Sequence, residues 1–353
     1  MNRPCVSRIR RDPPRAIAWQ PRWPNCSISD AVATNPTPVR VATRASELAR
    51  WQADHVAGLL RGAHPGLEIE IVPVSTEGDR RTDVPLSVIG GKGVFSKEIQ
   101  RAVLDGRADI AVHSAKDLPA LTPDGLTLAA LPTRGDPRDA LVGADLASLR
   151  SAVDEGRGAV VATGSARRRV QLAALVPGVG FEELRGNMAT RLQRSGEFDA
   201  IVVAVAALER LELTAHLSEV LAPDAMVPQV GQGALAIECR SDERWIRDLL
   251  GAIDDAATNA TVSAERAFLV ELGGDCSLPA GAHCTIVGPD ELRIEGVLAA
   301  EPDPGSPVLR GSLSTSMGPQ EPSLEAQGSP ADRSPEELGR ALAVSLRARM
   351  QGG

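Results

Sequence analysis

The 353-residue chain contains no tyrosine, and its four Trp and four Phe bring the aromatic content to only 2%. Proteins that bind single-stranded nucleic acid stack bases on aromatic side chains and present a basic surface. This chain has a formal net charge of -8, so its composition argues against a nucleic-acid partner. No apolar run approaches the ~20 residues that span a bilayer, so we expect no transmembrane helix and no membrane partner.

Lysine is also scarce, because only Lys92, Lys97 and Lys116 occur among 38 basic residues. A genome that favours Arg codons explains the scarcity, but it does not explain why all three lie within one short stretch. Where Arg is the usual cation, a retained Lys indicates a place that needs a compact ammonium group.

The chain has five cysteines, at positions 5, 26, 239, 276 and 284. Their number is odd and their spacing is irregular. No apolar signal segment with a cleavage site precedes the body of the chain. Both features predict a reducing, cytoplasmic compartment. Cys276, His283 and Cys284 could suggest zinc, but a structural zinc site needs four ligands, so we expect no metal.

Residues 1–38 contain seven prolines and six arginines and show no apolar periodicity. This composition predicts a disordered N-terminal extension. A targeting peptide is the alternative, but the prolines oppose the amphipathic helix that it would need. An extension without a fold, or a misplaced start codon, fits the segment better.

From Val39 the pattern alternates between strands and helices, which predicts an α/β fold with parallel or mixed sheets. In the first part we expect strands at 39–43, 67–71 and 109–113, with helices beginning at Ser46 and Ser96. A second unit starts near Pro137, with strands at 159–163 and 199–205 and helices after Ser165 and at Asn187. One more strand, 233–239, follows a Gly231-Gln232-Gly233 turn. Two α/β lobes with a ligand between them are the architecture that this order favours.

The C-terminal part follows another pattern. A helix over 257–272 ends at Gly273-Gly274, and short alternating runs at 283–287, 292–298 and 308–313 predict three strands. A polar, Pro-rich linker leads to Ser334-Pro335-Glu336-Glu337, which combines a capping Ser, a Pro at the first position and a Glu at the third. The sequence thus predicts a small α+β third domain.

Two segments carry the strongest local signal for chemistry, 90–95 with its glycine-rich turn and Lys92, and 113–119 with Asp117. The turn fails as a phosphate loop, because Gly93 stands where that motif needs Ser or Thr. Asp117 follows a predicted strand end, where a carboxylate can reach a ligand. An ordinary loop or cap Asp is the alternative interpretation.

Arginines recur where strands turn into helices, which predicts an anion site. Helix N-termini offer free N–H groups, and Arg adds bidentate recognition of carboxylates. The absence of a nucleotide fingerprint favours carboxylates over phosphates. Solvated arginines in an Arg-rich chain are the alternative. The residues concerned are Arg44, Arg167, Arg168, Arg185, Arg191 and Arg210.

These motifs, in this order, resemble the hydroxymethylbilane synthase family, also called the porphobilinogen deaminases. The resemblance covers about residues 39–300 and rests on segments 40–44, 90–95, 113–119, 163–168, 184–187, 230–234 and 273–281. It implies a transferase of tetrapyrrole and haem synthesis that joins four porphobilinogen molecules head to tail into hydroxymethylbilane, with release of four ammonia. It also implies a covalent dipyrromethane cofactor on Cys276 and a catalytic carboxylate at Asp117.

The resemblance further implies two periplasmic-binding-protein-like (type II) lobes with mixed sheets and a small α+β C-terminal domain. We expect lobe 1 at 39–134 plus 230–253, lobe 2 at 135–229 and the third domain at 257–353. The chain would act as a cytoplasmic monomer and pass its product to uroporphyrinogen III synthase. Cofactor and substrate would be bound by Arg44, Ser46, Lys92, Phe95, Ser114, Lys116, Thr163, Ser165, Arg167, Arg168, Arg185, Arg191 and Arg210.

A different class of protein shares these features in part. A non-catalytic solute-binding module of the same two-lobed shape would need the arginines, but it would need neither Asp117 nor Cys276. An export signal would have favoured that alternative.

Overall fold

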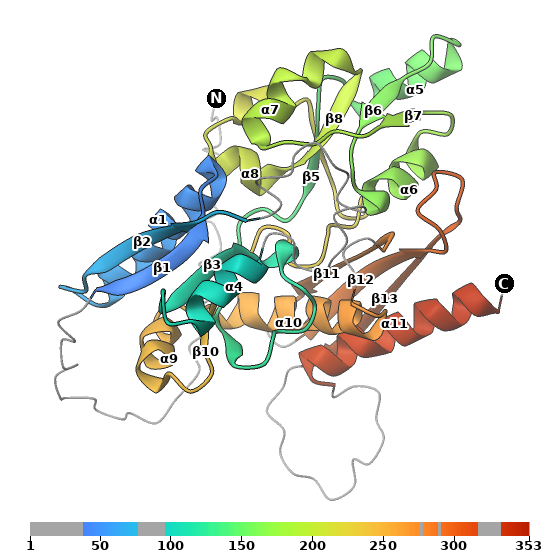
Figure 1. The fold of residues 1–353 in the computed structure, drawn as a ribbon. Coiled ribbons are helices and arrows are strands. Elements are labelled where there is room, and N and C mark those ends of the chain that lie inside the picture. The colour runs from blue at the N-terminus through green and yellow to red at the C-terminus, as the bar shows by residue number, and fades with distance from the viewer. Residues whose placement is uncertain (1–37, 77–95, 275–277, 289–290, 317–332, 353) are drawn as a thin grey trace, which may run out of the picture. The chain divides into compact units, whose positions relative to one another are not determined.

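The computed structural model describes residues 38–76, 96–274, 278–288, 291–316 and 333–352, which lie in one compact unit spanning 35–353. Two five-stranded mixed sheets and one three-stranded sheet form its framework (Figure 1). This architecture confirms the predicted fold class, an α/β fold with two lobes and a smaller α+β domain. Predicted features at residues 1–37, 77–95, 275–277 and 317–332 lie outside the described residues.

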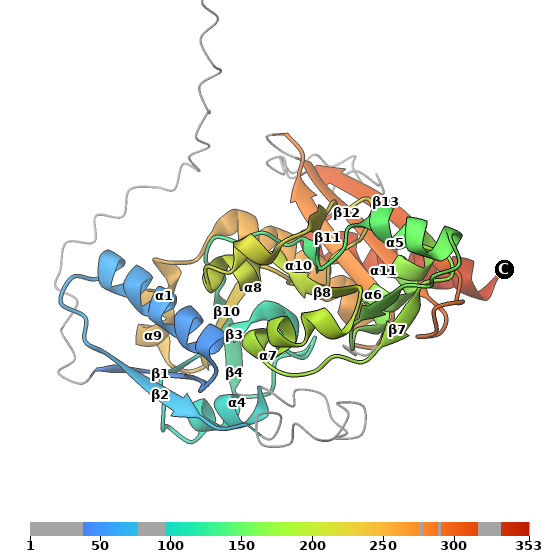
Figure 2. The ribbon, with the colours of Figure 1, turned by 90° about the horizontal axis from the view of Figure 1, so that it is seen from above.

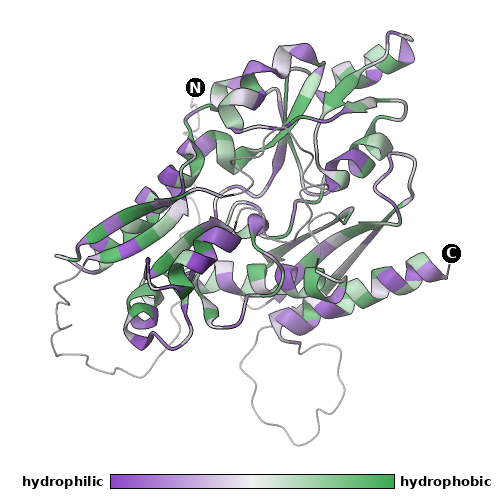
Figure 3. Cartoon of the chain, in the orientation of Figure 1, coloured by the Kyte–Doolittle hydropathy of each residue, from purple (hydrophilic) through white to green (hydrophobic). Residues whose placement is uncertain are grey.

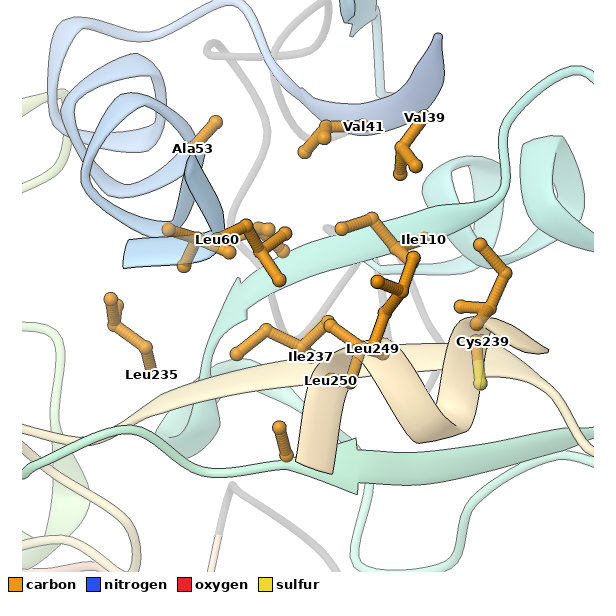
Figure 4. Packing of buried hydrophobic residues seen from close by; sticks show 14 residues of the cluster. Val39, Val41, Ala53, Leu60, Ile110, Leu235, Ile237, Cys239, Leu249 and Leu250 are labelled. Carbon is orange, nitrogen blue, oxygen red and sulfur yellow. The ribbon is translucent and has the colours of Figure 1, made fainter. Parts of the chain in front are cut away.

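The first sheet has the order β2-β1-β3-β10-β4, in which β10 is antiparallel to both of its neighbours. Its buried strands pack against one face of helix α1, and Figure 4 shows Leu60 of that helix among Val41, Ile110 and Ile237. The strands are β1 (Val39–Arg44), β2 (Ile69–Val74), β3 (Ile110–Ser114), β4 (Leu126–Ala130) and β10 (Leu235–Arg240). The helices are α1 (Glu47–Ala63), α4 (Lys97–Leu104) and α9 (Arg244–Gly251), with a 3-10 turn η1 (Ala115–Asp117).

The second sheet, β7-β6-β8-β5-β9, repeats this pattern, with three parallel strands followed by an antiparallel strand and an edge strand. Its strands are β5 (Asp139–Val142), β6 (Val160–Ala162), β7 (Gly180–Glu182), β8 (Ala200–Ala204) and β9 (Glu219–Leu221). Its helices are α5 (Leu146–Asp154), α6 (Ala166–Leu175), α7 (Met188–Gln193) and α8 (Val205–Arg210), with 3-10 turns η2 (Ser195–Glu197) and η3 (Thr214–His216).

The chain crosses between these two sheets twice, from β4 to β5 and from β9 to β10. The two crossing segments lie side by side, because Gly135 N donates to Gly233 O at 3.1 Å. As a result the antiparallel strand of each sheet begins at the same junction. Residues on these crossings can therefore contact both sheets.

The third sheet, β11-β12-β13, is antiparallel and packs against α10 and α11 (Figures 1 and 2). Gly339 of α11 leaves no room for a Cβ against the carbonyl of Ala264, so the two helices pack at close range. The predicted capping box is present, because Ser334 Oγ accepts from Glu337 N and Glu337 accepts from Ser334 N. The elements are α10 (Ala256–Glu271), β11 (Ala280–Ile286), β12 (Glu291–Ala299), β13 (Val308–Ser316) and α11 (Pro335–Gln351).

Local sequence patterns located the longer elements but missed short ones. Helix starts at Ser46, Ser96, Ser165 and Asn187 are confirmed, as are the predicted strands β1, β2, β3, β6, β8 and β10. Strands β4, β5, β7 and β9 and helices α5, α8 and α9 were not predicted. Three- to five-residue strands are too short to show alternation, and their neighbours in the sheet decide them. In Figure 3 hydrophobic and hydrophilic residues alternate along the helices. Among the helices described, none has the length and apolarity to span a bilayer.

Candidate active site

Asp117 lies at the carboxyl end of β3, in the turn η1, with its side chain exposed. It lines a small cavity together with Arg44, Ser46 and Ser114. The four residues meet because β1 and β3 are parallel neighbours, so their carboxyl ends reach the same edge of the sheet. The structure thus brings three of the predicted binding residues, Arg44, Ser46 and Ser114, together with the predicted catalytic Asp117.

Helix α1 orients this edge. Ser46 caps the helix, since its hydroxyl accepts from Ala49 N at 3.4 Å. Gln52, which is 3% exposed, donates from Nε2 to Ser114 Oγ at 2.8 Å. Gln52 was not predicted as a site residue, although an amide in the buried stripe of a helix is itself a signal, because a buried polar group needs a partner.

Lys116 stands next to Asp117 and is half-buried. Its ammonium donates to Gln232 Oε1 at 3.1 Å. Burial, followed by the charge of Arg168, lowers the pKa of Lys116 to about 8, while Asp117 and Asp139 partly offset that effect. The residue therefore carries its charge at neutral pH but lies close to losing it.

Arg167 and Arg168 share one carboxylate. Arg167 Nη1 and Arg168 Nη2 each lie 2.7 Å from an oxygen of Asp139, which is fully buried. The two arginine side chains are only 3% and 8% exposed, so the alternative that they are solvated is wrong. Asp139 was not predicted as a site residue; its position before the apolar run 140–142 was the only available signal.

The two arginines differ in what remains available to a ligand. Arg168 uses all three nitrogens, on Asp139 and on the carbonyl of Val202. Arg167 bonds Asp139 and the carbonyl of Val227 through Nη1 alone. Its buried Nε and Nη2 have no hydrogen-bond partner among the residues that the structure describes. Arg167 therefore has donors left for an anion, whereas a binding role for Arg168 remains a prediction.

Thr163 and Ser165 lie between β6 and α6. Thr163 is buried, and its hydroxyl accepts from Ser165 N at 3.2 Å. Ser165 precedes the first turn of α6 but makes no side-chain capping bond there. The predicted helix start is confirmed, while its predicted contact with substrate or cofactor remains a prediction.

Arg191 and Arg185 lie near the same group of charges. Arg191 Nε donates to Gly186 O at 2.9 Å. Burial lowers the pKa of Arg191 to about 10, and the charges of Arg168 and Arg185 act in the same direction, opposed by Asp117. Arg185 Nε lies 3.8 Å from Glu183 Oε1. These couplings place cations from α6, α7 and the loop before α7 within electrostatic reach of one another.

Arg210 lies farther along, at the end of α8. Its Nη2 donates to Gly233 O at 2.6 Å, and its guanidinium lies 5.5 Å from the ring of Trp51 in α1. Burial lowers its pKa to about 10. Arg210 thus joins a helix of the second sheet to α1 and to the crossing before β10.

Lys92, Phe95 and Cys276 lie outside the described residues. The described residues on either side of the Cys276 loop belong to the third domain. Gly274, just before that loop, approaches Ala120. Arg266 of α10 donates from Nη2 to the carbonyls of Pro119 and Ala120, at 3.2 and 2.9 Å. The end of α10 is therefore tied to the segment that follows Asp117.

Comparison with known proteins identifies the family. Residues 39–248 match the model for the "Porphobilinogen deaminase, dipyromethane cofactor binding domain", and residues 259–304 match the model for its C-terminal domain. The chain belongs to the porphobilinogen deaminase family. A porphobilinogen deaminase of Nitratidesulfovibrio vulgaris (strain DSM 19637 / Miyazaki F) is 46% identical over 73% of this chain and 81% of the relative. A second, from Maridesulfovibrio salexigens, is 45% identical over 76% and 87%.

Solved structures show a weaker likeness. A TRAP periplasmic solute binding protein from Ralstonia eutropha H16 aligns at a TM-score of 0.35 and 16% identity, over 63% of this chain and 77% of that one. This score is too low to carry an argument about function. The family match, in contrast, covers more than half of the chain.

Membership of the porphobilinogen deaminase family defines the activity. The chain is a transferase of porphyrin synthesis, a hydroxymethylbilane synthase that condenses four porphobilinogen molecules on a dipyrromethane cofactor and releases four ammonia. The site described above has the chemistry that such a cofactor needs. The pyrrole rings of the cofactor carry carboxylates, and Arg167 has two buried N–H groups that lack a partner in the described part of the chain. The residues present therefore fit the group.

Proposed function

We propose that Asp117 is the catalytic carboxylate of this enzyme and that Cys276 attaches the dipyrromethane. The observation that supports the first assignment is the position of Asp117. Its exposed carboxylate lies at a strand end, lines a cavity with Arg44 and Ser114, and is electrostatically coupled to Lys116 and Arg191. A carboxylate that is exposed at a cavity and lies close to cations is placed where a charged substrate can reach it.

The cations have a clear purpose in this proposal. Each porphobilinogen carries an acetate and a propionate, so a growing chain of rings brings about two carboxylates per ring into one site. Charge-assisted bonds from arginine and lysine hold such groups and fix the register of the chain. We assign this binding to Arg44, Ser46, Lys92, Ser114, Lys116, Thr163, Ser165, Arg167, Arg168, Arg185, Arg191 and Arg210, and ring packing to Phe95.

The role of Asp117 follows from the charge that develops in the reaction. When ammonia leaves porphobilinogen, the substrate becomes a cation with its charge spread over the pyrrole nitrogen. A fixed carboxylate near that nitrogen stabilises the cation, and electrostatic stabilisation of this kind is commonly the largest contribution to catalysis. The same carboxylate can accept a proton when the next ring is joined.

The cofactor would be held by Cys276 and by Arg167, whose Nε and Nη2 are available for a carboxylate. When bound, the dipyrromethane supplies the free pyrrole carbon to which the first substrate ring is joined. The residues of this chain do the rest: arginines neutralise carboxylates, Ser114 is held by Gln52, and Asp117 meets the developing positive charge.

The test of this assignment is Asp117→Asn, with Asp124→Asn as the matched control, because Asp124 is an exposed Asp in the same segment. We expect Asp117→Asn to lose at least about 100-fold in turnover. Its thermal unfolding midpoint should equal that of the wild type. Asp124→Asn should retain full activity. A folded Asp117→Asn enzyme with wild-type turnover would remove Asp117 from the mechanism.

Attachment of the cofactor is tested by intact mass. Wild-type protein should carry the added mass of two pyrrole units, and peptide mapping should place them on Cys276. Cys276→Ser should lack this mass, while Cys239→Ser should retain it, since Cys239 is buried in β10 and burial raises the pKa of its thiol to about 11. A loaded Cys276→Ser protein would point to another attachment site.

We also propose that the enzyme works in the cytoplasm as a monomer and hands its product to uroporphyrinogen III synthase. Cys239 and Cys284 are both unpaired and buried, which supports a reducing compartment. Light scattering of the purified protein tests the monomer directly. A mass of two chains at micromolar concentration would refute it.

A further inference from the structure

Gln232 occupies the middle of the turn Gly231-Gln232-Gly233, at the crossing before β10, and its side chain is fully buried. The turn has little freedom. Gly231 and Gly233 have φ of +71° and +86°. A Cβ on Gly231 would lie 3.2 Å from Lys116 N, and one on Gly233 would lie 2.5 Å from Gly135 O. The turn is therefore wedged between η1 and the other crossing segment, and this fixes where the Gln232 side chain begins.

The Gln232 amide bonds groups of opposite charge. Its Oε1 accepts from Lys116 Nζ at 3.1 Å, and its Nε2 donates to Asp139 Oδ1 at 3.0 Å and to Pro137 O at 2.7 Å. An ammonium can only donate, and a carboxylate can only accept. Only one orientation of the amide satisfies both, so the side chain is oriented as well as placed.

These bonds form a continuous path between the two sheets. Lys116 belongs to η1, after β3 of the first sheet, and Asp139 begins β5 of the second. Asp139 in turn holds Arg167 and Arg168. The charged groups that face Lys116 are Arg168, Asp117, Asp139 and Arg167. Arg168 and Arg167 repel the ammonium, whereas Asp117 and Asp139 attract it, so its charge depends on where the ammonium is held among these four groups.

We propose that Gln232 is a positioning residue that holds the Lys116 ammonium beside Asp117 by tying it to Asp139 of the second sheet. The inference rests on the proposed roles of Asp117 and Lys116, and it assigns to a neutral residue the task of keeping that cation charged and in place. A lysine has a flexible four-carbon stem, so without a fixed acceptor its charge would not stay at one point.

A neutral amide suits this position better than either alternative. A carboxylate in its place would lie against Asp139 and compete for Arg167 and Arg168. An apolar side chain would leave the ammonium without its acceptor and leave one buried oxygen of Asp139 with fewer donors. The amide compensates both partners and adds no charge.

The scarcity of lysine makes the inference directly measurable. Lysine labelled with ¹³C at Cε gives only three side-chain signals, from Lys92, Lys97 and Lys116. In the wild-type holoenzyme the signal that vanishes in Lys116→Arg belongs to Lys116, and its titration midpoint is the reference for the Gln232 variants.

Two variants then test Gln232 itself. In Gln232→Glu the added negative charge should move the Lys116 titration up by about one pH unit, and in Gln232→Met the lost acceptor should move it down. The alkaline limb of the pH profile of kcat/KM should move in the same directions. Gln229→Met is the matched control, because the Gln229 side chain donates to the backbone carbonyl of Lys116, at 3.3 Å, and not to its ammonium. Its Lys116 signal should not move.

The outcomes separate this inference from the proposed function. If both Gln232 variants leave the Lys116 titration at its wild-type position, Gln232 does not position Lys116, whatever the activity of the enzyme. If Gln232→Met does not fold, the wild-type and Gln232→Glu titrations still decide the question. Loss of activity in Asp117→Asn bears on the proposed function alone.

Discussion

Arg168 Nη2 and Asp139 Oδ1 lie 2.7 Å apart, with the aspartate fully buried and the arginine side chain 8% exposed. The same carboxylate binds Arg167 and Gln232, so four side chains from α6, β5 and the crossing before β10 meet at one point. Two buried cations around one anion leave an excess of positive charge. In an enzyme whose substrate carries carboxylates, that excess can serve binding as well as folding.

Removal of Asp139 should destabilise the fold strongly. Asp139→Ala leaves two buried guanidinium groups without their counter-ion, and breaking a buried pair from one side costs about 3–5 kcal/mol. Urea unfolding monitored by circular dichroism measures the loss. Asp248→Ala is the control, because Asp248 pairs with Arg244 on the surface of α9 and should change stability by no more than about 0.5 kcal/mol. Equal effects from the two variants would contradict this interpretation.

Asp139 should also contribute to acid sensitivity. Burial alone raises its pKa, but the guanidinium charges of Arg167 and Arg168 outweigh burial and hold the pKa well below its usual range. A carboxyl whose pKa is lower in the folded than in the unfolded state stabilises the fold above the unfolded value of about 3.9, and that contribution is lost as pH falls. The gap in unfolding free energy between wild type and Asp139→Asn should therefore narrow below about pH 4. A gap that stays constant from pH 7 to pH 3 would argue against the assignment.

Glu265 should be a second stability centre. It is fully buried in α10 and accepts from both terminal nitrogens of Arg134, from Gly231 N and from Cys284 N. It thereby joins the third domain to both crossing segments. We expect Glu265→Ala to cost about 3–5 kcal/mol, and a double-mutant cycle with Arg134→Ala to show a coupling of about 0.5–3 kcal/mol. Glu295→Ala removes a partly exposed partner of Arg293 and should have a small effect. Additive single variants at positions 134 and 265 would show that the pair is not coupled.

Gly233 should not tolerate a side chain. Its φ of +86° is unfavourable for an L-residue, and a Cβ there would lie 2.5 Å from Gly135 O. Gly233→Ala should therefore destabilise the protein by at least about 2 kcal/mol. Gly58→Ala is the opposite case, since Gly58 lies inside α1 with open space around it, and the change should stabilise by about 0.5–1 kcal/mol. The thermal unfolding midpoint should fall in Gly233→Ala and rise in Gly58→Ala.

The sequence alone determined the class of fold and the family. Helix starts such as Ser46 and Ser334 were predictable because the cap and the buried stripe are local patterns within a few residues, and Asn187 was predictable from its cap. Asp117 and Arg44 were named from their places at strand ends, Ser114 from the family resemblance, and parallel strands bring such places together. The family resemblance added residue roles that no local pattern contains.

Only the tertiary structure decided how the charges are paired. Arg134 and Glu265 lie 131 residues apart in the chain, and Lys116 and Gln232 lie 116 apart. Glu265 carries no local signal of its importance, and the glycines around Gln232 indicate a turn but not what its side chain contacts. Their burial, and hence the strength of their bonds, depends on where the two crossings and the third domain meet. Short strands such as β5 follow the same rule, because partners in the sheet stabilise them more than their own four residues do.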